Sequence, residues 1–97
     1  MERKQVASPA QCRAARALLK WTQRHLAEQA GVARKTVADF EAGVRRLHLR
    51  TRADITTALQ TAGVEFTWSE GIEGVRCARK FPVLAAIPVT AAVADAL

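Results

Sequence analysis

The 97-residue sequence has few of the residues from which metal, disulfide and many catalytic sites are built: two cysteines, two histidines and no tyrosine. Cys12 and Cys77 are far apart in the chain, and neither has zinc-finger spacing to a histidine. We therefore expect both cysteines to pack in the core of a reduced protein, without a metal, and His25 to be an exposed helix residue. The sequence also contains no nucleophile–base pair, carboxylate dyad or phosphate-binding glycine loop. These features predict neither an enzyme nor a cofactor-binding protein.

Long apolar runs are also scarce. The first ten residues are charged where a secretory leader would be apolar. The longest apolar stretch, residues 81–97, is short for a membrane span and is interrupted by Pro82 and Pro88. We therefore expect a cytoplasmic protein without a membrane segment. Three interpretations of this tail stay open: a packed extension, an ill-ordered end, and a contact with a second copy or with a protein partner.

Positive charge is abundant by contrast, with a formal net charge of +6. The segment from Arg13 to Arg52 holds ten basic and three acidic residues, so its own net charge is +7. Such a concentration favours a polyanionic partner over a merely solvated surface. Single-stranded nucleic acid is disfavoured, because only three phenylalanines and two tryptophans are present to stack on bases. At this length the chain is one domain with a small core, which association with a second copy would stabilise.

The first helix is predicted to begin after Ser8, which is followed by a proline and, three residues later, by Gln11, as in a capping box. The helix should run to about Lys20, with Cys12, Ala15 and Leu19 facing inward. Residues 1–7 are polar and are expected to be frayed. Trp21 follows the helix and is expected to cover the core rather than to meet a base.

The stretch Thr22–Ala42 has the pattern of two short helices joined by a tight turn, which is typical of a DNA-reading helix-turn-helix. Thr22 is expected to cap the first helix, and Gly31 to end it in the left-handed conformation that a sharp exit needs. The small side chain of Ala27 allows the second helix to approach closely. The inward positions of that helix are Val37 and Phe40, and those left largely unburied are Arg34, Lys35, Thr36, Ala38 and Asp39.

After these helices, Gly43–Leu49 is predicted to be a loop that carries Arg45 and Arg46. Thr51 is expected to cap a fourth helix, Arg52–Ala62, with one apolar face.

Beyond Gly63 the apolar period changes to two, which indicates strands at residues 64–69 and 75–80 with a turn at Gly71–Gly74. An isolated hairpin is marginally stable in water, so it must pack on the helices or pair with a second subunit. The candidates for holding two copies together are the apolar side chains of the first strand, Val64, Phe66 and Trp68, and the tail.

The sequence thus predicts a mainly α fold: a repressor-like helix-turn-helix domain of four to five helices at residues 8–63, a β-hairpin at 64–80 and an apolar tail at 81–97.

The chain resembles the helix-turn-helix regulators of the phage-repressor and Cro type, also called the xenobiotic-response-element family. The resemblance covers about Gln11–Val64 and rests on the spacing of Gln23, Leu26, Ala27, Gly31, Val32, Val37, Phe40 and Glu41. It implies a transcriptional regulator, and a repressor in particular, that binds double-stranded DNA as a homodimer. An antitoxin-like module that binds a partner protein through its C-terminal part stays open as an alternative.

The resemblance also implies roles for single residues. Arg34 and Lys35 would read base edges in the major groove, with Asp39 as a further groove-facing position. Gln23 and Thr36 would contact phosphates. The other implied roles are a sugar–phosphate contact for Arg45 and Arg46 and a structural ion pair between Arg16 and Glu41. Ala33 stands where the family often has a serine or threonine that caps the second helix of the motif.

Overall fold

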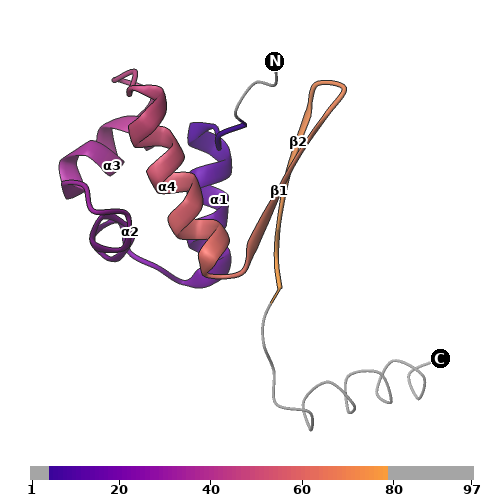
Figure 1. Cartoon of the computed structure of the whole chain (residues 1–97), viewed down its shortest axis with the longest axis horizontal. Helices are drawn as coiled ribbons and strands as arrows, with labels where there is room; N and C mark the ends of the chain where they lie inside the picture. The colour runs from indigo at the N-terminus through magenta and orange to yellow at the C-terminus, as the bar shows by residue number, and fades with distance from the viewer. Residues whose placement is uncertain (1–4, 79–97) are drawn as a thin grey trace, which may run out of the picture.

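The computed structural model describes residues 5–78, which form four helices followed by a β-hairpin (Figure 1). The elements are α1 (Pro9–Leu19), α2 (Gln23–Ala30), α3 (Arg34–Ala42), α4 (Leu49–Thr61), β1 (Val64–Ser69) and β2 (Ile72–Cys77). This confirms the predicted mainly α architecture with a C-terminal hairpin. In Figure 1, α2 and α3 lie on one side of α4 and the hairpin lies on the other. The predictions for residues 1–4 and 79–97, which include the end of the second strand and the tail, lie outside the described residues.

The helix ends follow the predicted local chemistry. The Ser8 hydroxyl accepts a hydrogen bond from the Gln11 amide at 3.1 Å, and the Gln11 side chain accepts one from the Ser8 amide at 3.0 Å, which completes the capping box. Thr22 caps α2 by accepting from the His25 amide at 3.0 Å. Gly31 ends α2 with φ of 74°, in the left-handed region that favours glycine. These three residues define the start of α1 and the two ends of α2.

Gln11 also joins α1 to the hairpin, which sequence reasoning did not foresee. Its side chain is buried, and its Nε2 donates to the carbonyl oxygens of Thr67 at 3.2 Å and Gly74 at 3.1 Å. Its Oε1 accepts from the Trp68 indole nitrogen at 2.9 Å. One capping side chain therefore fixes the start of the fold against its C-terminal strands.

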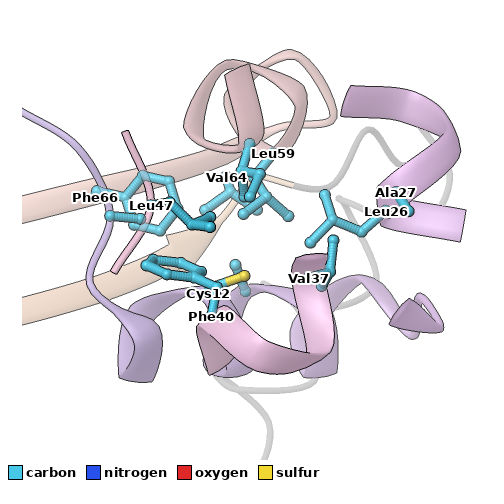
Figure 2. Packing of buried hydrophobic residues seen from close by; sticks show 12 residues of the cluster. Cys12, Leu26, Ala27, Val37, Phe40, Leu47, Leu59, Val64 and Phe66 are labelled. Atoms are coloured by element: carbon cyan, nitrogen blue, oxygen red, sulfur yellow. The ribbon is translucent and has the colours of Figure 1, made fainter. Parts of the chain in front are cut away.

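The core lies between the four helices and β1 (Figure 2). Leu26, Val37, Ile55 and Leu59 are fully buried, and so is Cys12, as predicted. Trp21 packs against this cluster, also as predicted. His25 is half-buried rather than exposed, because its ring packs edge-on against Trp21 with the ring centroids 4.5 Å apart. The core thus extends to the start of α2.

Two boundaries differ from the predictions in the first half of the fold. Ala7 was expected to be frayed, but it is buried, and its amide donates to Thr56 Oγ1 at 2.9 Å. The fourth helix begins at Leu49 with His48 as its N-cap, not at Arg52 with Thr51 as its cap. Leu49 and Arg50 are good helix formers, and buried Leu47 holds the preceding loop, so the helix begins earlier.

The hairpin turn is also tighter than predicted. Glu70 and Gly71 form the two-residue connection, with φ values of 50° and 79°. Positive φ at both central residues matches the twist of a tight hairpin, which a turn spread over Gly71–Gly74 would lack. Gly74 lies inside β2 opposite Thr67, where a Cβ atom would collide with the Thr67 side chain.

The apolar face of β1 is used within the chain. Val64 and Phe66 are buried in the core between the helices and the hairpin, and Trp68 is half-buried with its indole bonded to Gln11. The expectation that these side chains hold two copies together is therefore wrong for Val64 and Phe66, because both are buried within their own chain. For the half-buried Trp68 it stays a prediction. The opposite face of the hairpin carries an exposed ion pair between Arg76 and Glu65, at 2.5 Å.

Candidate nucleic-acid interface

The front of α3 presents two cationic side chains to solvent. Arg34 and Lys35 are exposed in the first turn of the helix, because Val37 and Phe40 take the inward positions. Thr36, Ala38 and Asp39 are half-buried, less exposed than predicted. The N-cap Ala33 makes no side-chain hydrogen bond to the helix. The first amides of α3 therefore lack the cap that a serine or threonine would supply.

Behind this front lies a buried carboxylate, Glu41, which is 3% exposed. Arg16 donates to it twice, from Nε to Oε2 at 2.7 Å and from a terminal nitrogen to Oε1 at 2.8 Å. A third guanidinium hydrogen bond goes to the Trp21 carbonyl at 2.9 Å. The structure thus places Arg16 and Glu41 in a two-pronged ion pair that ties the first helix to the last turn of α3.

Two further side chains donate to the same carboxylate. Gln23 Nε2 lies 3.0 Å from Glu41 Oε1, and the Cys12 thiol lies 3.1 Å from Oε2. The Gln23 oxygen in turn accepts from Arg34 at 3.2 Å. A line of hydrogen bonds therefore runs from the buried Glu41 to the exposed Arg34. The resemblance implied a phosphate contact for Gln23; in the structure its side-chain oxygen accepts a hydrogen bond from Arg34.

The surroundings of Glu41 decide its charge. Burial acts to raise its pKa, but the hydrogen bonds from Arg16, Gln23 and Cys12 and the positive charge of Arg16 hold the pKa below its usual value. Burial, followed by the hydrogen bond to Glu41, raises the pKa of the Cys12 thiol far above its usual range. The carboxylate is therefore ionised and the thiol neutral near pH 7.

Lys35 and Asp39 form an ion pair one helical turn apart, at 3.3 Å. The Lys35 side chain is 80% exposed, so the pair adds little to stability. Asp39 limits the positive charge of the α3 surface, yet it leaves most of the Lys35 side chain open to solvent.

A groove of about 300 Å³ lies beside the start of α3, between this helix and the start of α4. It brings together Thr36, Arg45 and Arg46, which were predicted as site residues from different parts of the sequence. His48 and Thr51 line the same groove and were not predicted to belong to the site. Their place follows from the early start of α4, which the predicted loop at Gly43–Leu49 did not include.

Not every basic residue of the segment 13–52 faces this surface. Arg16 is held by Glu41, and Arg13 donates to the Glu41 carbonyl oxygen. Arg52 donates to the Ala7 carbonyl at 3.2 Å and lies over the Phe40 ring, 5.6 Å from its centroid. These three guanidinium groups stabilise the fold. Exposed basic residues on α3 itself and in the loop that follows it are Arg34, Lys35, Arg45 and Arg46.

A family model for the helix-turn-helix matches residues 13–66, more than half of the chain. The matched segment contains α2, α3 and the groove at the start of α3. No curated protein matches the chain. Within residues 5–78, no helix has both the length and the apolar character to cross a membrane.

Proposed function

The chain belongs to the helix-turn-helix family of the phage-repressor and Cro type, whose members bind DNA and regulate transcription, and we propose that it is a homodimeric repressor of specific duplex sequences. The observation that carries this proposal is the exposed pair Arg34 and Lys35 at the front of α3, next to a groove lined by Arg45 and Arg46. A helix that enters the major groove with its first turn places such residues on base edges.

The two parts of this surface have different tasks in the proposal. The guanidinium of Arg34 reads guanine by a two-pronged hydrogen bond, and its contact with Gln23 aims it before DNA arrives. Arg45, Arg46 and Thr36 hold a phosphate in the groove, together with the uncapped amides at the starts of α3 and α4. Lys35 exchanges its contact with Asp39 for an acceptor on a base.

Two copies are needed because one recognition helix contacts only a few base pairs, too few to select one site in a genome. A dimer related by a twofold axis presents two copies of α3 about one turn of DNA apart. Bound across a promoter, such a dimer represses transcription by occupying the promoter.

Selection from a random duplex pool tests this proposal: the recovered sites should be palindromic, with half-sites about 10 base pairs apart. Recovery of single, unpaired half-sites would contradict the dimer.

Arg34→Ala and Arg45→Ala should change the affinity for DNA in different ways. Arg34→Ala removes a base contact, so it should cost about 1–3 kcal/mol on the selected site and much less on scrambled DNA. Arg45→Ala removes a phosphate contact, so it should weaken both DNAs by the same factor. Titration of each variant against both duplexes measures the difference. Arg76→Ala is the matched control, because it removes an exposed guanidinium from the hairpin. Equal losses of Arg34→Ala on both duplexes would refute its role as a base reader.

A further inference from the structure

An open groove of about 520 Å³ lies at the end of the fold away from residues 43–48, the loop proposed to contact DNA. Its walls are the last residues of α1 and α4 and the end of β2: Leu18, Leu19, Lys20, Thr61, Ala62, Gly63, Cys77 and Ala78. The loop at residues 43–48 precedes the first residue of α4, whereas this groove lies at the last turn of that helix. A helix of 13 residues separates the two sites by about 20 Å.

The chain is fixed against this groove where the C-terminal tail begins. The Ala78 amide donates to the Gly63 carbonyl at 2.7 Å, and Ala78 itself lines the groove. Gly63 has φ of 111°, and a Cβ atom on it would lie 2.8 Å from the Ala78 oxygen. The close approach of these two backbone segments therefore depends on glycine. It fixes the point from which residue 79 continues.

We propose that the groove is filled by the start of the chain's own tail, Phe81–Leu84, bound in cis. Three residues beyond Ala78 span at most about 10 Å, so Phe81 reaches the groove without a long connection. The segment Phe81–Leu84 is apolar, and the walls offer the apolar side chains of Leu19 and Cys77. A very short tether gives a high effective concentration, which favours the chain's own tail over that of a second copy.

The groove lies at the last turn of α4, away from the loop at residues 43–48, so a segment bound there would leave the proposed DNA surface open. The proposal concerns the folded chain alone. Its failure would leave the proposed DNA-binding function unaffected.

Cys77 supplies a reporter for this site. It is a half-buried free thiol in the groove wall, whereas Cys12 is fully buried and serves as an internal control for unfolding. Labelling with a maleimide, followed by peptide mass spectrometry, gives the rate at each cysteine. We expect Phe81→Asp to raise the Cys77 rate about tenfold and to leave the Cys12 rate unchanged, because a charged residue would leave the groove. Val93→Asp is the matched control and should change neither rate.

Two results would overturn the proposal. One is an unchanged Cys77 rate in Phe81→Asp with Cys12 still protected. The other is protection of Cys77 in the parent chain that increases with protein concentration, which would assign the groove to the tail of a second copy.

A second variant avoids any dependence on how Phe81→Asp folds. Thr61 is exposed at the groove wall, so Thr61→Arg should fill the groove without disturbing the core. With the tail displaced, trypsin should cleave after Lys80 several times faster than in the parent chain. Gln60→Arg, at the neighbouring exposed position outside the groove, is the control. Equal cleavage rates in Thr61→Arg and Gln60→Arg would also contradict binding of the tail in cis.

Discussion

Replacing Glu41 with alanine is expected to destabilise the fold by about 3–5 kcal/mol, because it leaves a partly buried guanidinium without its counter-charge. Arg16 is 20% exposed and Glu41 is 3% exposed, so little water is available to replace the lost hydrogen bonds. The amide of Gln23 and the thiol of Cys12 lose an acceptor at the same time. Urea denaturation followed by tryptophan fluorescence measures the change in the free energy of unfolding.

Asp39→Ala is the matched control, because it also removes a carboxylate from an ion pair of α3. Its partner Lys35 is exposed, so the expected cost is below about 1 kcal/mol. If the two variants were equally stable, the hydrogen-bonded cluster around Glu41 would have no special role in the fold.

The same carboxylate should make stability depend on pH. The folded pKa of Glu41 lies below its unfolded value, so the stabilisation is fully present above the unfolded value, near pH 4.5. It is lost as the pH falls through the folded pKa. The parent chain should therefore lose stability as the pH falls below about 4.5. Glu41→Gln should be less stable at pH 7, and its free energy of unfolding should fall less steeply in acid. Denaturant titrations at several pH values measure both slopes. Identical slopes in the two proteins would contradict the lowered pKa.

Local sequence signals predicted most of the fold. Ser8, Thr22 and Gly31 act through side chains or backbone preferences that concern only their own turn of the chain, so a sequence pattern is enough to place them. Long-range contacts were predicted less well. The burial of Ala7 depends on Thr56, which lies 49 residues away, and no local pattern reports such a bond. The start of α4 likewise depends on how Leu47 packs.

In the candidate site, too, local features were predicted and long-range contacts were not. The spacing within α3 was enough to predict that Arg34 and Lys35 are exposed. The line from Glu41 through Gln23 to Arg34 runs from the last turn of α3 through α2 to the first turn of α3, so only the fold reveals it. The position of His48 in the groove was missed because it depends on the boundary of α4. Sequence patterns therefore identified the charged residues, and the structure shows which of them act together.

The affinity for duplex DNA should fall steeply with salt. Arg45 and Arg46 with the helix N-termini, together with the positive charge that Arg34 and Lys35 bring into the groove of the DNA, are expected to neutralise about four to six phosphates per subunit. Each phosphate contact contributes about 0.9 to the slope of log affinity against log salt, so a dimer should show a slope of about −7 to −11. Between 50 and 200 mM salt the affinity should therefore fall by about 10⁴-fold or more. Titration of the selected duplex at four salt concentrations, with sedimentation to count the bound copies, measures both quantities.

Variants of the loop separate the phosphate contacts from general attraction between the positive protein and DNA. The double variant Arg45→Ala/Arg46→Ala should reduce the magnitude of the slope by about 4 for a dimer, because two contacts are lost in each subunit. Arg76→Ala removes the same kind of charge from the exposed face of the hairpin, which lies across α4 from α2 and α3, and it should leave the slope unchanged. A slope that fell equally in both variants would assign the salt dependence to net charge rather than to the groove beside α3. A slope near zero in the parent chain would remove the electrostatic basis of the proposed interface, because contacts with phosphates release counterions at every site where they form.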